Sequence, residues 1–128
     1  MKITLGELNS HGYPTTPEID ANLQILLERL NKVRDAYGVP MIITSGLRSL
    51  ELQMKVNPKA PHSKHLSGQA ADVLDQNGVL KKWILAHLPL MEEIGLWFEA
   101  FDSTGGEQGG WVHAQIVPPA SQHRFFLP

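Results

Sequence analysis

The chain has 128 residues, of which 42% are hydrophobic and 19% charged, and this predicts a single globular domain over residues 1–128. The formal net charge of −2 gives no electrostatic signature of binding to DNA, RNA or an anionic membrane surface. No apolar stretch approaches the roughly 20 residues of a membrane-spanning helix, so we expect no membrane insertion. The first residues lack the apolar run of a signal peptide, so we expect cytoplasmic synthesis.

The first regular element expected is a long helix. Residues 1–15 are expected to form an irregular N-terminal arm. Thr16 is then expected to cap a helix with Pro17 at its first position, and Gly38 to end it. Apolar residues recur along this segment at spacings of three and four, which indicates one buried stripe: Ile19, Leu23, Leu26, Leu30 and Val33.

The remaining elements alternate between strands and helices. We expect strands over residues 41–45, 69–74, 96–101 and 111–117. We expect helices over residues 49–55 and 77–87, a further helix from Pro89 to about residue 94, and coil in the C-terminal tail. This order, with an antiparallel pair formed by the last two strands, predicts an α+β fold in which helices pack against a small, mostly antiparallel sheet.

Side chains alternate across a strand, so the last three strands can each be divided into a core face and a polar face. The residues expected on the core face are Ala71, Val73, Leu96, Phe98, Ala100, Val112, Ala114 and Ile116. If these strands are neighbours, Asp72, Glu99 and His113 gather on the opposite face, with His65 above them in the preceding turn. Gln115 shares this face, where it supports a ligand, contacts substrate or forms an ordinary hydrogen bond within the sheet.

His65, Asp72 and His113 offer two imidazoles and one carboxylate, in a chain without cysteine. Three protein ligands with a fourth position left for water are typical of a catalytic zinc site, whereas structural zinc sites are closed and usually contain thiolates. We therefore expect these three residues to bind Zn²⁺. Because imidazole also suits nickel, copper and iron, the identity of the metal stays open at this stage.

These motifs resemble those of the zinc D-Ala-D-Ala carboxypeptidase and L-Ala-D-Glu endopeptidase family of peptidoglycan peptidases, which includes bacteriophage endolysins. The matching residues are Ser63, His65, Gly68, Ala70 and Asp72 in the first family motif, Trp111 and His113 in the second, and residues 45–49 in a Ser-Gly-x-Arg-Ser motif. The resemblance extends from about Thr16 to the C-terminus. It implies the α+β fold that these peptidases share with the hedgehog signalling domain.

Two further residues are expected to take part in catalysis. The guanidinium of Arg48 is suited to pair with a substrate carboxylate or to stabilise a developing oxyanion. Several family members place their catalytic carboxylate three residues before the last histidine, where this chain has Gly110. We expect Glu99 as the general base instead, because its strand is expected to pair with the last strand and because Leu-Trp-Phe-Glu is similar to phage-type members. Glu107 is the second candidate and Asp102 the third.

The function expected is a zinc peptidase that hydrolyses a peptide bond in peptidoglycan stem peptides, as a carboxypeptidase or an endopeptidase. The loss of the usual carboxylate at Gly110 favours an alternative, a non-catalytic zinc-containing module that binds cell wall or belongs to a phage particle. A zinc amidase or other hydrolase outside cell-wall chemistry is a third possibility. We expect a monomer that reaches the wall after release or as part of a phage particle. Trp97 and Trp111 are candidate walls of the substrate groove, with packing favoured for Trp97.

Overall fold

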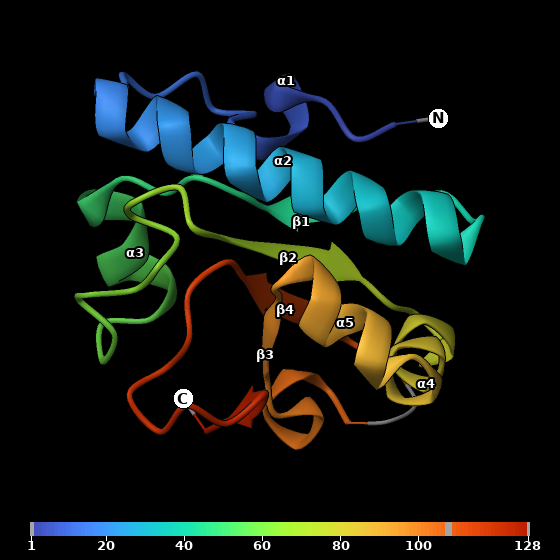
Figure 1. Ribbon diagram of the computed structural model, residues 1–128. Coiled ribbons are helices and arrows are strands. Elements are labelled where there is room, and N and C mark those ends of the chain that lie inside the picture. The colour runs from blue at the N-terminus through green and yellow to red at the C-terminus, as the bar shows by residue number, and fades with distance from the viewer. Residues whose placement is uncertain (1, 107–108, 128) are drawn as a thin grey trace.

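Within residues 2–106 and 109–127, which the computed structural model describes, five strands form one sheet in the order β1-β2-β4-β3-β5 (Figure 1). The strands are β1 (Ile43–Ser45), β2 (Ala70–Leu74), β3 (Trp97–Glu99), β4 (Trp111–Gln115) and β5 (Phe125–Phe126). The helices are α1 (Leu5–Leu8), α2 (Pro17–Tyr37), α3 (Leu50–Val56), α4 (Val79–Ala86) and α5 (Leu88–Ile94), and a 3-10 helix, η1 (Phe101–Thr104), follows β3. Neighbouring strands are antiparallel except β3 and β5, so the predicted α+β fold is confirmed.

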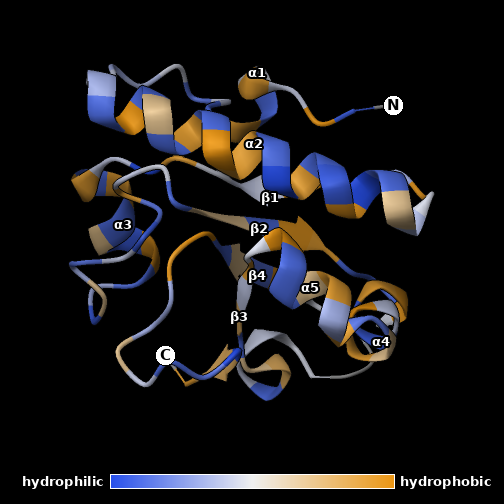
Figure 2. Cartoon of the chain, in the orientation of Figure 1, coloured by the Kyte–Doolittle hydropathy of each residue, from blue (hydrophilic) through white to orange (hydrophobic). Residues whose placement is uncertain are grey.

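Helix α2 begins and ends where its sequence signals predict. The Thr16 hydroxyl accepts a hydrogen bond from the Ile19 N–H at 3.2 Å. Gly38 ends the helix with a φ of 76°, a left-handed conformation that glycine adopts without steric penalty. Figure 2 shows hydrophobic and hydrophilic residues mixed along α2, as expected for a helix with one buried face. Among the described residues, no helix, α2 included, is both long enough and apolar enough to span a bilayer.

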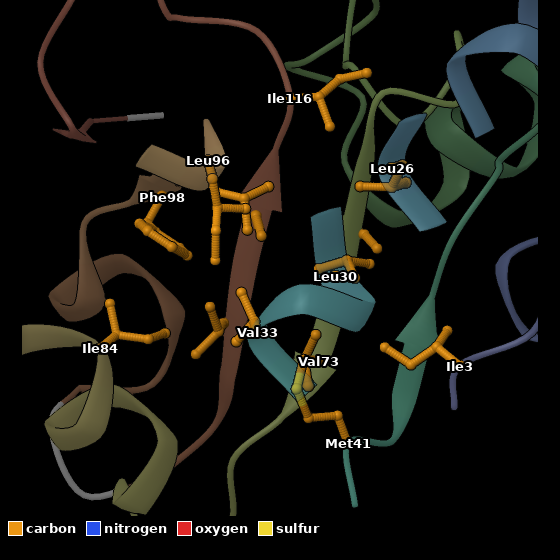
Figure 3. Close-up of a cluster of buried hydrophobic side chains, with 14 of the residues drawn as sticks. Ile3, Leu26, Leu30, Val33, Met41, Val73, Ile84, Leu96, Phe98 and Ile116 are labelled. Atoms are coloured by element: carbon orange, nitrogen blue, oxygen red, sulfur yellow. The ribbon is translucent and has the colours of Figure 1, made fainter. Parts of the chain in front are cut away.

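The core lies between the helices and one face of the sheet. Buried residues of α2 (Leu23, Leu26, Leu30 and Val33) belong to one cluster with Ala71, Val73, Phe98, Val112 and Ala114 of the strands, several of which are drawn in Figure 3. Helices α4 and α5 add Leu80, Ile84, Met91 and Ile94 to the same cluster. Ala100 is only partly buried, because the chain leaves the sheet after β3. The alternation predicted for the last three strands therefore places the core face as expected and turns the polar face away from α2, α4 and α5.

The N-terminal segment is not irregular throughout, as the sequence had suggested, because it contains helix α1. Thr4 and Glu7 form a capping box, in which each side chain accepts a hydrogen bond from the backbone N–H of the other residue. Leu8 is fully buried and Ile3 nearly so. The Ile3 N–H also donates to Asn31 Oδ1 at 2.8 Å, which ties the segment to α2.

The C-terminal tail is not entirely coil, because Phe125 and Phe126 form strand β5 at the edge of the sheet. The Phe98 N–H donates to the Arg124 carbonyl at 2.8 Å, and the Ala100 N–H donates to the Phe126 carbonyl at 2.7 Å. The strand predicted over residues 96–101 is shorter than expected, since the chain turns into η1 at its end. The tail thereby reaches the polar face of the sheet.

Candidate metal centre

The three predicted ligands come together on the polar face of the sheet. Strands β2 and β4 pair in a register that puts Asp72 directly opposite His113. His65 lies in the turn before β2, and its side chain is only 2% exposed. One nitrogen from each histidine and one carboxylate oxygen of Asp72 all lie within 4.8 Å of one another. Strand register thus joins residues that are far apart in the sequence.

Gly46 fixes the orientation of the His65 imidazole. His65 Nδ1 lies 2.8 Å from the Gly46 carbonyl oxygen. Because a carbonyl oxygen only accepts hydrogen bonds, Nδ1 carries a proton, and Nε2 is the nitrogen that can bind a metal. Nε2 faces Asp72 Oδ1 at 3.3 Å. Gly46 itself lies so close to α1 that a Cβ at this position would overlap the Leu8 carbonyl, so the position favours glycine.

His113 faces Asp72 through Nδ1, whereas His65 faces it through Nε2. Its Nδ1 lies 3.1 Å from Asp72 Oδ1, and its Nε2 lies 3.0 Å from Gln115 Oε1. The Gln115 amide nitrogen donates to the Val117 carbonyl at 2.9 Å, which leaves the amide oxygen to accept from His113. His113 therefore keeps a proton on Nε2, and Nδ1 is the nitrogen that can bind a metal.

The carboxylate of Asp72 joins the two imidazoles. Oδ1 faces both of them, while Oδ2 accepts a hydrogen bond from Arg48 Nη2 at 3.0 Å. Burial raises the pKa of Asp72, but the hydrogen bonds and charges of His113 and His65 outweigh this and hold the pKa well below its usual value. Asp72 is therefore ionised and available as a ligand.

The donor set fits a zinc ion. Two neutral imidazole nitrogens and one carboxylate oxygen, each oriented by a partner on its far side, are the ligands and supporting contacts that catalytic zinc sites use. These three atoms lie close enough together for one cation to contact all of them. Without a metal, a proton takes that role: burial lowers the pKa of His113, but the hydrogen bond and charge of Asp72 overcome this and raise it.

Arg48 has a contact that the sequence did not predict, since it orients the carboxylate of Asp72. Its Nε donates to Ser45 Oγ at 2.9 Å, and its Nη1 donates to Gln53 Oε1 at 2.9 Å. Together with the Nη2 contact to Asp72, these bonds use three of the five N–H groups that a guanidinium carries. Two N–H groups remain beyond these three contacts, and the side chain lines the same pocket as the cluster.

Gln53 is a site residue that sequence reasoning missed. Its side chain is buried on α3, whereas the neighbouring apolar residues Leu50 and Met54 are 58% and 42% exposed. This reverses the usual pattern of a short amphipathic helix. The spacing of residues in the sequence does not predict that Gln53 is buried. The side of α3 that is buried depends on how the helix packs next to Arg48.

The cluster opens into a pocket of about 640 Å³, and Glu99 lines it from β3. Burial raises the pKa of this half-buried glutamate; the charge of Asp72 adds to the rise, while His113 and Arg48 oppose it. Asp102 is exposed on η1 and is not among the described residues that line the pocket. Glu107, the second candidate base, lies outside the described residues.

Aromatic residues form part of the pocket wall. Trp111, which is 38% exposed, and Phe126 both line it, and the Phe126 ring meets the His113 ring edge-on with centroids 5.9 Å apart. Trp97 is not among the described lining residues, and the Arg124 guanidinium lies 4.5 Å from the centre of its ring. The contribution of Phe126 was not predicted, since a two-residue strand leaves no periodic signal in the sequence.

Comparison with known families places the chain. The sequence model described as Peptidase M15 matches residues 2–95, which is well over half of the chain. The chain belongs to the Peptidase M15 family. The matched segment contains Arg48, His65 and Asp72, whereas Glu99 and His113 lie beyond it and join the site through the sheet. The match of this M15 peptidase also includes the N-terminal segment, which lay outside the resemblance drawn from motifs.

A solved structure has the same fold as this M15 peptidase. The crystal structure of Serratia marcescens L-Ala D-Glu endopeptidase ChiX matches with a TM-score of 0.51 and 20% sequence identity. The alignment covers 86% of this chain and 95% of that chain. No curated protein matches the sequence. The two proteins therefore share an α+β fold.

Proposed function

We propose that this M15 peptidase hydrolyses a peptide bond in the stem peptides of bacterial peptidoglycan, with Zn²⁺ held by His65, Asp72 and His113. The observation that carries the proposal is the convergence of His65 Nε2, Asp72 Oδ1 and His113 Nδ1 in an open pocket. The choice of substrate is supported by family membership and by the fold shared with an L-Ala D-Glu endopeptidase.

The zinc ion, when bound, lowers the pKa of a coordinated water toward ~7 and polarises the substrate carbonyl. Glu99 takes a proton from the attacking water and delivers it to the leaving amine. The position of Glu99 in the wall of the same pocket as His65, Asp72 and His113 supports this role, because a general base must lie within reach of the proton that it takes. Arg48 keeps Asp72 in place and directs its remaining N–H groups to the developing negative charge or to a substrate carboxylate.

The metal requirement can be tested with purified protein. We expect about one zinc per chain, and we expect zinc chelation to abolish the release of peptide fragments from purified peptidoglycan, followed by mass spectrometry. His113→Ala should lose both zinc and activity. Stoichiometric zinc with no hydrolysis of any muropeptide would instead identify a non-catalytic zinc-binding module.

The role of Glu99 is tested by Glu99→Gln, which removes the proton acceptor and keeps the shape of the side chain. We expect zinc content to stay as in wild type while kcat falls by ~10²–10⁴-fold, the usual contribution of a proton shuttle. Glu93→Gln on the exposed side of α5 is the matched control and should keep full activity. If Glu99→Gln cleaves muropeptides at the wild-type rate, the base is another carboxylate, and Glu107 is the next to replace.

A further inference from the structure

Gln115 lies beside the metal ligands without being one of them. Gln115 is only 4% exposed. It lies in the middle of the sheet, where it pairs with Ala70 of β2 on one side and with Trp97 of β3 on the other. Its backbone is therefore held from both sides. Its side chain contacts His113 rather than the apolar core.

The direction of the Gln115 amide determines the direction of the His113 ring. The amide nitrogen donates to the Val117 carbonyl at 2.9 Å, so a reversed amide would place its oxygen against that carbonyl. The amide oxygen therefore stays toward His113 Nε2 at 3.0 Å. An imidazole turned by half a rotation would present a carbon atom to the cluster in place of Nδ1, and that carbon cannot bind a metal.

We propose that Gln115 is a positioning residue that holds the ring and the tautomer of His113, so that Nδ1 faces the metal. This inference rests on the proposed function and deepens it. Gln115 orients His113 through Nε2, as the Gly46 carbonyl orients His65 through Nδ1. Partners on the second nitrogen of a ligating histidine fix its orientation and strengthen metal binding.

Two substitutions separate positioning from simple packing. Gln115→Met keeps the size of the side chain but removes the acceptor, and it should weaken zinc binding by ~10–100-fold. Gln115→Glu keeps an acceptor for His113 Nε2 but sets a carboxylate oxygen against the Val117 carbonyl. The positioning role predicts that Gln115→Glu binds zinc at least as tightly as wild type, even if it unfolds at a lower temperature. A packing role predicts the reverse order, with methionine the milder change.

Zinc dissociation constants are measured by competition with a chromophoric chelator, starting from metal-free protein. Gln69→Met is the matched control, because the half-buried Gln69 side chain accepts a hydrogen bond from Ser67 and not from a histidine. We expect its zinc affinity to equal that of wild type. Unchanged affinity in Gln115→Met, or equal losses in Gln115→Met and Gln115→Glu, would overturn the positioning role.

Nuclear magnetic resonance of ¹⁵N-histidine-labelled, zinc-loaded protein provides a second, direct readout of the tautomer. Wild type should show slowly exchanging imidazole protons on His65 Nδ1 and on His113 Nε2, and Gln115→Met should retain only the His65 signal. A proton on His113 Nδ1 in the zinc-loaded wild type would refute the inference. If the zinc affinities follow the predicted order but no muropeptide is cleaved, the proposed function fails and the positioning role stands. If wild type cleaves muropeptides but Gln115→Met binds zinc with unchanged affinity, the proposed function stands and the positioning role fails.

Discussion

Gly46 connects helix α1 to the proposed metal ligand His65, and Gly46→Ala tests this connection. A Cβ at this position would overlap backbone atoms of Leu8, and the Leu47 N–H holds the same Leu8 carbonyl at 2.7 Å. The Leu8 backbone therefore cannot move away without losing a hydrogen bond. Gly46 is not among the glycines with positive φ, so alanine adds crowding and no conformational strain.

The expected loss of stability follows from these contacts. Crowding in a well-packed interior costs about 1–3 kcal/mol. Replacing glycine by alanine also restricts the unfolded chain, which offsets ~0.4–1 kcal/mol of that cost. A net loss of about 1–2 kcal/mol should lower the melting temperature by roughly 4–8 °C in a domain of this size. Because the Gly46 carbonyl orients His65, we also expect zinc binding to weaken by about 10-fold.

Thermal unfolding of the metal-free protein, followed by circular dichroism, measures the first effect, and chelator competition measures the second. Gly6→Ala in α1 is the control, since the nearest atom to its new Cβ is Thr4 Oγ1 at 3.8 Å. We expect the control to be as stable as wild type or slightly more stable. A Gly46→Ala protein that melts at or above the wild-type temperature would show that Leu8 of α1 does not pack against Gly46 as closely as the structure indicates.

Two further predictions concern charged side chains. Arg48→Lys should lower kcat/KM for muropeptides by ~10²-fold with zinc still bound, because one ammonium cannot replace the separate contacts of the guanidinium; wild-type kinetics would contradict this. Lys81→Met should lower the free energy of unfolding in urea by about 2–5 kcal/mol, because the buried ammonium donates to the carbonyls of Thr104, Gly106 and Gly109. The exposed neighbour Lys82→Met should change it by less than about 0.5 kcal/mol, and equal losses in the two variants would argue against the buried contacts.

The sequence by itself determined the features that depend on a few neighbouring residues. The Thr16 cap and the Gly38 terminus of α2 are local, because each satisfies backbone groups within one helical turn. The alternation in β2 and β4 is also local, and it assigned Asp72 and His113 to the face opposite the core before their register was known. Asp72 and His113 were predicted for this reason, and His65 from its place in the turn before the strand; the structure brings the three together.

Only the tertiary structure decided how these residues are supported. The contact of Gly46 with Leu8, the hydrogen bond from Arg48 to Asp72, and the burial of Gln53 each join segments whose approach depends on how α1, α3 and the sheet pack. Strand β5 has the same origin, because two residues carry no periodic signal and pair only once an edge is present. Short-range preferences place a side chain on a face, whereas the partner that orients it comes from packing between distant segments.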